Sequence, residues 1–181
     1  LLMASGSVVT VNQHLYKRTP FNPDRDLVAI SNVAPAPQVL VVYPNFPPRT
    51  IKELIALAKS TPGTILFGSA GIGSQAHLAA EKFAHTAGIN VVHVPYKGAA
   101  LAMIDAVSGR IQFVTPSLAA VLNFIRQEGR LRALGVMSRQ RAPQLPDVPA
   151  IAETLPGFEN LGWFGLMAPA GTPKPIIEKI Y

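Results

Sequence analysis

The 181-residue chain contains no cysteine, so it has no disulfide bridge, no thiolate metal site and no cysteine nucleophile. Charged residues make up only 14% of the chain against 49% hydrophobic residues, a balance that excludes a disordered protein. No apolar run approaches the roughly 18 residues of a membrane-spanning helix, and no signal peptide is visible. The chain starts at Leu1 without an initiator methionine and ends inside an expected helix after Pro173. We therefore expect an internal fragment of a longer protein.

Charge of one sign is concentrated in a single segment. The net charge of +6 suits an anionic partner, and five arginines lie between Arg126 and Arg141. Nucleic-acid surfaces usually interleave such cations with aromatic residues. Here no aromatic residue follows Phe124 within the segment, and apolar residues alternate with the arginines. This pattern favours a solvated face, and we expect no nucleic acid among the partners.

Apolar segments with strand and helix patterns alternate along the chain. We expect a strand that begins with residues 27–30 and further strands at 38–43, 64–67, 91–94, 111–114, 131–136 and 163–169. A capping box at Thr50–Glu53 opens a helix that ends at Thr61, and further helices are expected at 74–87, 99–107, 117–127 and, as a short one, near 148–154. This alternation predicts an α/β fold with parallel strands, right-handed crossovers and helices on both faces of the sheet. Ligands of such folds bind at the carboxyl ends of the strands.

The segment Thr64-Ile-Leu-Phe-Gly-Ser-Ala-Gly-Ile-Gly-Ser-Gln-Ala-His-Leu78 is the most informative part of the sequence. A strand leads into a loop at residues 69–74, and an amphipathic helix follows the loop. We call residues 69–74 the glycine loop. Glycines permit backbone angles that turn several N–H groups toward one point. The helix N-terminus adds free donors and partial positive charge. The segment therefore predicts a site for a carboxylate or phosphate.

Other polar residues are expected near the same sheet edge. His77 is the third residue of the helix after an expected Ser74 N-cap, so it either closes the first turn or contacts ligand. Tyr96 and Lys97 lie on the turn that follows the next strand. Near the start of the chain, Ser5-Gly-Ser7 follows a short apolar run and is either a plain turn or a second set of donors.

Two enzymatic alternatives remain open at the glycine loop. Gly71-x-Gly73-x-x-Ala76 matches the dinucleotide fingerprint, but the next strand ends without the acid that binds ribose. Lys97 could instead face a 2′-phosphate, which gives an NADP-dependent α/β oxidoreductase as the alternative function. A hydrolase would pair Ser69 or Ser74 with His77 or His93, and the acid available to orient the imidazole is Asp105.

Catalytic machinery is otherwise missing from the loops that follow the strands. They contain donors and small residues but no paired carboxylates, no oriented base and no lysine to anchor a cofactor. The four histidines show no metal-ligand spacing. We therefore predict a binding protein that is not an enzyme and holds neither a metal nor a cofactor.

Several motifs, in this order, resemble those of the tripartite tricarboxylate transporter substrate-binding receptors, the Bug or TctC-like periplasmic proteins. The resemblance runs from Asn12-Gln-His-Leu-Tyr16 to the C-terminus. Its motifs are Phe67-Gly-Ser-Ala-Gly-Ile-Gly-Ser-Gln-Ala-His-Leu78, His93-Val-Pro-Tyr-Lys-Gly98, Leu131-Arg-Ala-Leu-Gly-Val136, Leu145-Pro-Asp-Val-Pro149, Pro156-Gly-Phe-Glu159 and Ala168-Pro-Ala-Gly-Thr-Pro173.

The resemblance implies a type II periplasmic binding fold, in which two lobes with doubly wound sheets close on the ligand. Residues 1–42 would form part of lobe one and the first crossing strand, and 43–163 a complete lobe two. Residues 164–181 would form the return strand and the start of the C-terminal part of lobe one, which is incomplete in this chain.

The function implied is capture of a small carboxylate in the periplasm by a monomeric receptor. The ligand would be a di- or tricarboxylate, an acidic amino acid or an aromatic acid, delivered to the membrane permease subunits of the transporter; signalling to a membrane kinase stays an alternative. The residues that the resemblance places at the ligand are Ser5 and Ser7 from lobe one, and Ser69, Ala70, Gly71, Gly73, Ser74, His77, Tyr96 and Ser117 from lobe two.

One departure from the family pattern lies after the strand that contains Phe113. Relatives often carry Asp-Asn there, whereas this chain has Thr115-Pro-Ser117. A ligand contact at this point is therefore expected to differ.

Overall fold

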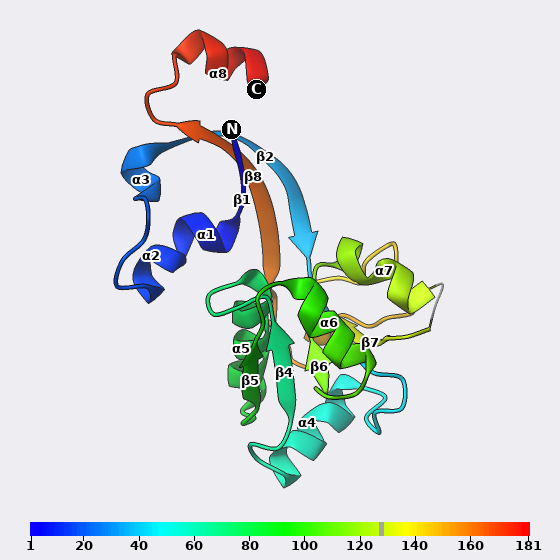
Figure 1. Ribbon diagram of the computed structural model, residues 1–181. Helices are drawn as coiled ribbons and strands as arrows, with labels where there is room; N and C mark the ends of the chain where they lie inside the picture. Colours follow the sequence, from blue (N-terminus) through cyan, green and yellow to red (C-terminus); the bar gives the residue numbers. More distant parts are fainter. Residues whose placement is uncertain (127–128) are drawn as a thin grey trace. The chain divides into compact units, whose positions relative to one another are not determined.

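The computed structural model describes residues 1–126 and 129–181, which form two compact units (Figure 1). Unit 1 consists of Leu1–Ala36 and Gly162–Tyr181, and unit 2 is Pro37–Leu161. The expected lobe boundaries at residues 42 and 163 concern the complete protein and stay a prediction. Within the described ranges, no helix combines the length and the apolar character needed to cross a membrane.

Unit 1 is a small three-stranded sheet with short helices. Its strands, β1 (Leu2–Ser5), β2 (Leu27–Pro37) and β8 (Leu161–Pro169), take the order β1-β8-β2, and β1 runs antiparallel to β8. The helices are α1 (Gly6–Thr10), α2 (Asn12–Leu15), α3 (Pro23–Asp26) and α8 (Lys174–Ile180). The strand expected to begin at Leu27 does so, and it runs to Pro37. Its prolines at 35 and 37 are tolerated because β2 is an edge strand, where an N–H is not needed for pairing.

Unit 2 is a five-stranded sheet with helices on both faces. Its strands are β3 (Val39–Val42), β4 (Leu66–Ser69), β5 (Val92–Pro95), β6 (Phe113–Val114) and β7 (Arg132–Val136), in the order β5-β4-β6-β3-β7. The helices are α4 (Ile51–Ser60), α5 (Gln75–Ala87), α6 (Ala99–Val107), α7 (Leu118–Arg126) and the 3₁₀ turn η1 (Ile151–Glu153). The elements match the sequence expectations within about two residues; Gln127, the expected end of α7, lies outside the described residues.

The strands that alternate with helices from residue 64 onward share one direction, as predicted, but the sheet as a whole is mixed. β4 is parallel to β5 and β6, but β3 is antiparallel to both β6 and β7. Thus β4, β5, β6 and β7 share one direction and β3 opposes them. Alternation predicts parallel pairing only for strands that are joined by a crossover within one set. β3 is the strand by which the chain enters unit 2, and β6 separates it from β4.

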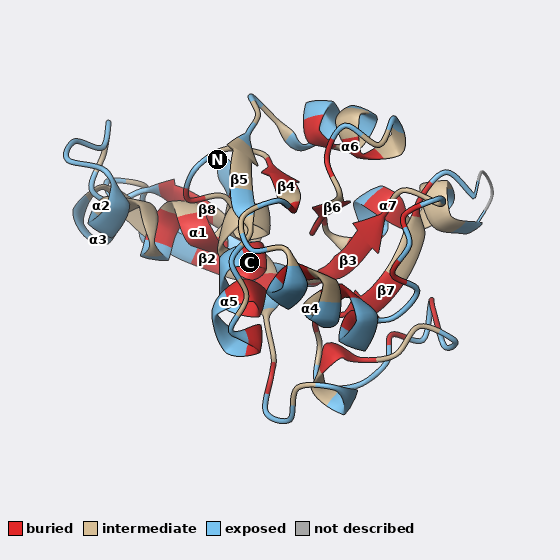
Figure 2. Cartoon of the chain, turned by 90° about the horizontal axis from the view of Figure 1, so that it is seen from below, coloured by how far each residue is buried: buried red, intermediate tan, exposed pale blue. Residues whose placement is uncertain are grey.

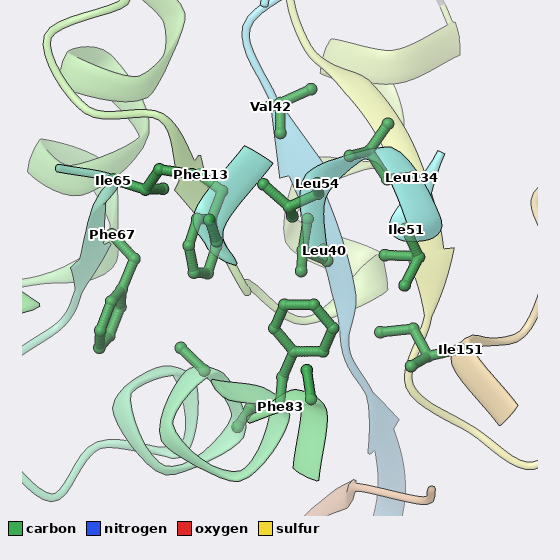
Figure 3. Close-up of a cluster of buried hydrophobic side chains, with 14 of the residues drawn as sticks. Leu40, Val42, Ile51, Leu54, Ile65, Phe67, Phe83, Phe113, Leu134 and Ile151 are labelled. Carbon is green, nitrogen blue, oxygen red and sulfur yellow. The ribbon is translucent and has the colours of Figure 1, made fainter. Parts of the chain in front are cut away.

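The alternating side chains of β3 divide the core of unit 2 into two clusters. Leu40 and Val42 pack with α4 and α5, whereas Val39 and Val41 pack with α6 and α7. All four residues are buried, which fits a strand covered on both faces (Figure 2). Figure 3 shows the first cluster, in which Phe83 of α5 lies near Leu40. The helices therefore cover both faces of the sheet, as predicted.

The arginines between 126 and 141 bind groups of the protein itself. Arg139 and Arg141 form ion pairs with Glu159 and Glu153, each with a distance of 2.8 Å. The expectation of a solvated face is wrong for Arg132. Its guanidinium is half-buried and donates to three backbone carbonyls between β3 and α4, those of Pro44, Phe46 and Pro48.

Candidate functional site

Three helices of unit 2 begin at one edge of its sheet. α5 follows β4, α6 follows β5 and α7 follows β6, and these three strands are neighbours with the same direction. Their carboxyl ends, and hence the three helix N-termini, lie at the same edge. The first turns of all three helices, which the structure describes throughout, carry no acidic residue. The partial positive charge of each N-terminus is therefore not offset by a carboxylate of its own first turn.

The glycine loop joins β4 to α5 by a turn that needs glycine at two positions. Gly71 has φ of +123° and Gly73 has φ of +75°, both in the region that side chains disfavour. Ser74 is the N-cap of α5, since its Oγ accepts the N–H of His77 at 3.2 Å. This confirms the predicted cap, which stabilises a helix by about 1 kcal/mol.

Most N–H groups of this loop already have acceptors within the protein. Gly71 N–H donates to Ser69 Oγ at 3.1 Å, Gly73 N–H donates to His77 Nδ1 at 3.2 Å, and Ser74 N–H donates to the Gly71 carbonyl at 3.1 Å. Ala70 N–H has no acceptor among the described residues. The expected convergence of several free donors on one point is therefore not the resting geometry. Side chains hold the glycine N–H groups instead.

Two histidine rings lie against each other beside the loop, and we call them the histidine pair: His77 of α5 and His93 of β5. Their ring centroids are 4.1 Å apart, and the Phe67 ring lies 4.8 Å from His93. His93 Nε2 is 2.6 Å from the buried Ser69 Oγ. Burial, followed by the proximity of His77, lowers the pKa of His93 to about 4. His93 is therefore a neutral imidazole at physiological pH.

Tyr96 is attached to the loop by its backbone rather than its hydroxyl. Its N–H donates to the Ser69 carbonyl at 3.1 Å, whereas its hydroxyl donates to Asp105 at 2.8 Å. Arg110 binds the other oxygen of Asp105 at 3.0 Å. Burial and the bond to Asp105 raise the pKa of Tyr96 to about 12.

These contacts weaken the hydrolase alternative. Asp105 is engaged by Tyr96 and Arg110 and bonds to neither imidazole in the described contacts. Ser69 does meet His93, but its side chain is inaccessible because only 1% of the residue is exposed. A nucleophile must reach a substrate atom, so this serine–histidine contact is structural.

Ser117 follows β6 at the same edge, near Gln38, which the sequence did not single out, and Thr115, which it named only as a departure from the family pattern. Gln38 is bridged to Ser117, and its Nε2 donates to the Thr115 carbonyl at 3.3 Å. Thr115 is fully buried, and its hydroxyl donates to the Ala76 carbonyl in the first turn of α5 at 2.6 Å. Polar residues at the ends of an apolar strand were the available signal, but their partners are distant in the sequence.

Ser5 and Ser7 belong to unit 1, so they are described separately from the glycine loop. Their hydroxyl oxygens are 3.1 Å apart, and Ser7 is buried. Gly6 between them lies against Trp163, whose Nε1 would be 2.6 Å from an added Cβ. In the described ranges, no three histidines or carboxylates are grouped as metal ligands would be.

Comparison with known proteins identifies the family. The model of the tripartite tricarboxylate transporter family receptor, TctC, matches residues 1–181. The chain belongs to this family. It is 40% identical over 181 residues to the protein of the tcbD–tcbE intergenic region of Pseudomonas sp. strain P51, covering 99% of this chain and 54% of that protein. It is 38% identical over 178 residues to BugT of Bordetella pertussis, covering 98% and 54%.

Solved structures of similar proteins share the fold. An R. palustris protein with adipate has a TM-score of 0.94 at 30% identity, and MatC from Rhodopseudomonas palustris with bound malate has 0.90 at 26%. The periplasmic binding protein BugD has 0.89 at 32% identity. Each match covers 98% of this chain and 59–60% of the other. The chain thus has the α/β fold of periplasmic binding proteins and spans about half the length of the curated relatives it matches.

Proposed function

We propose that the protein is a periplasmic solute-binding receptor that captures a small carboxylate and delivers it to the permease subunits of a tripartite tricarboxylate-type transporter. The single observation that carries this proposal is the edge of unit 2 at which three helix N-termini lie without acids in their first turns. Helix N-termini stabilise anions through their free N–H groups and their dipoles. Family membership supports the same function.

The ligand carboxylate is proposed to bind at the glycine loop, with Ala70 N–H as the donor that has no other acceptor. The loop residues Gly71, Gly73 and Ser74 would surround it, with His77, Tyr96 and Ser117 at the borders and Ser69 supporting the loop from beneath. The placement of Ser5 and Ser7 of unit 1 at the ligand stays a prediction from the family resemblance. Charge-assisted hydrogen bonds contribute about 1.5–3 kcal/mol each, so roughly micromolar affinity, which corresponds to about 8 kcal/mol, requires at least three of them.

The ligand class is proposed from the similar structures, two of which hold adipate and malate. Both are small dicarboxylic acids, so the first candidates are dicarboxylates, followed by tricarboxylates, acidic amino acids and aromatic acids. The receptor would act as a monomer that releases its ligand to the permease without altering it.

No observation at the loop favours the NADP-dependent oxidoreductase. Lys97, the residue proposed for a 2′-phosphate, is exposed, and the N–H groups of Gly71 and Gly73 are engaged by side chains.

A thermal-shift screen of the complete protein, as the cell produces it, tests the proposal. We expect adipate, malate or a related acid to raise the melting temperature by mass action, whereas the uncharged adipamide leaves it unchanged. Stabilisation by NADP but by none of the acids would support the enzyme instead. Equal stabilisation by adipate and adipamide would show that binding does not depend on the negative charge of the ligand and would contradict the proposed anion site.

A further inference from the structure

The bond between Gly73 and His77 fixes the protonation state of an imidazole beside the proposed ligand site. Gly73 N–H donates to His77 Nδ1 at 3.2 Å, so Nδ1 is an acceptor and carries no proton. The proton of the neutral ring must then lie on Nε2, which faces Glu81 Oε1 at 3.6 Å. His77 is thus held as the neutral Nε2–H tautomer while this bond exists.

A proton added to His77 breaks this arrangement. In an imidazolium both ring nitrogens are donors, so Nδ1–H and the Gly73 N–H would oppose each other. The Gly73 N–H would then be released from His77 Nδ1 at the moment when a positive ring appears beside it. A free amide donor and a cation together are what an incoming carboxylate needs.

The two rings of the histidine pair differ in their surroundings. A charge on His93 is disfavoured by its burial and by the nearby His77 ring, and its Nε2 already contacts Ser69 Oγ. His77 has a carboxylate partner in Glu81 on its own helix, and its side chain is 17% exposed. Glu81 and His93 are the titratable groups that the described contacts place against His77.

We propose that His77 couples ligand capture to the uptake of a proton: the carboxylate displaces the imidazole from Gly73 N–H, and the displaced ring becomes an imidazolium that pairs with the anion. His77 is a positioning residue in the empty site and a charged contact in the loaded one. Affinity then rises as the pH falls across the titration of this ring, approaching tenfold per pH unit for one proton per ligand. The inference rests on the proposed function and adds its proton linkage.

The coupling can be tested without any ligand, by nuclear magnetic resonance of the complete protein. We expect the ring nitrogens of His77 to report the Nε2–H tautomer at high pH, and the Gly73 amide resonance to move with the same midpoint as the ring. In His77→Asn, whose side-chain oxygen keeps an acceptor near the position of Nδ1, the Gly73 amide should no longer titrate. His85→Asn, an exposed histidine of the same helix, is the matched control and should leave the Gly73 titration intact. A Gly73 amide that ignores the ionisation of His77 would overturn the proposal.

Calorimetry with adipate tests the second half. Titrations in two buffers of different ionisation enthalpy should give uptake of up to one proton per adipate bound, and His77→Asn should reduce this uptake to near zero while His85→Asn retains it. Binding with no proton uptake, or with proton release, would overturn the proposal while leaving the receptor function intact. If neither adipate nor malate binds although Gly73 and His77 titrate together, the proposed function fails and the conformational coupling stands.

Discussion

Both units contain a strand that runs through serine and glycine into a helix, and the two loops use these residues differently. In unit 1, Ser5 precedes α1 without a side-chain capping bond, and its hydroxyl meets that of Ser7 instead. In unit 2, Ser69 and Ser74 both bind backbone N–H groups of the glycine loop. The serine hydroxyls of unit 2 thus bind backbone N–H groups, whereas those of Ser5 and Ser7 in unit 1 bind each other.

The glycines of the two loops are required for different reasons. At Gly6 there is no room for a side chain, because the Trp163 indole lies against its backbone. Gly71 and Gly73 have positive φ, so their requirement comes from the backbone itself. Similar serine–glycine sequences therefore need glycine for side-chain packing in unit 1 and for backbone conformation in unit 2.

The largest effect is expected from Gly6→Ala. The new Cβ would lie 2.6 Å from Trp163 Nε1, so the indole must move, and overpacking of this kind costs about 1–3 kcal/mol of unfolding free energy. Gly171→Ala in the same unit, where a Cβ meets no atom within 4 Å, is the control. The two are compared by their urea midpoints, and an equal loss in both would show that Gly6 is not held by packing.

Ser69→Ala should have the next largest effect. It leaves the Gly71 N–H and the half-buried His93 Nε2 without their partner, at a cost of about 1–3 kcal/mol. Ser5→Ala, which removes only a hydroxyl contact to Ser7, should cost less than half as much. Urea unfolding measures both, and a reversed order would contradict the comparison between the two loops.

Ser74→Ala should cost about 1 kcal/mol through the lost cap and should also weaken ligand binding. Thr50→Ala removes an equivalent cap from α4, where the Thr50 hydroxyl accepts the Glu53 N–H at 3.1 Å. The two variants should match in melting temperature and differ in affinity for the acid found by thermal shift. Unchanged affinity in Ser74→Ala would assign this serine to capping alone.

The smallest effect concerns pH, and it vanishes at neutrality. The folded-state pKa of His93, about 4, lies below the unfolded value of 6.5, so the unfolded chain binds more protons between these values. Stability should therefore fall as the pH drops from about 6.5 toward 4. Replacing this ring by phenylalanine (His93→Phe) should flatten the decline in urea midpoint between pH 7 and pH 5, whereas His85→Phe should not. A decline of unchanged slope in His93→Phe would show that another group is responsible.

Local rules were enough to predict most elements of unit 2 and the Ser74 cap of α5. These features depend on residues close together in the sequence, so short segments are enough to predict them. They are the strand and helix periodicity, the Thr50 and Ser74 caps and the positive-φ glycines. The same signals placed the glycine loop at a strand end and favoured an anion there. The motif order also predicted the family, which comparison confirmed.

Only the tertiary structure decided the direction of β3 and the partners of the loop. The parallel register that sets Phe67 opposite His93 brings Ser69 and His93 together across 24 residues, and no local pattern encodes that distance. The sequence by itself determined where the glycine loop and the N-terminus of α5 would lie, because helix caps and glycine turns depend on neighbouring residues. Which N–H groups of the loop are free depends on side chains that reach them only after the chain has folded, as Ser69 and His77 do at Gly71 and Gly73.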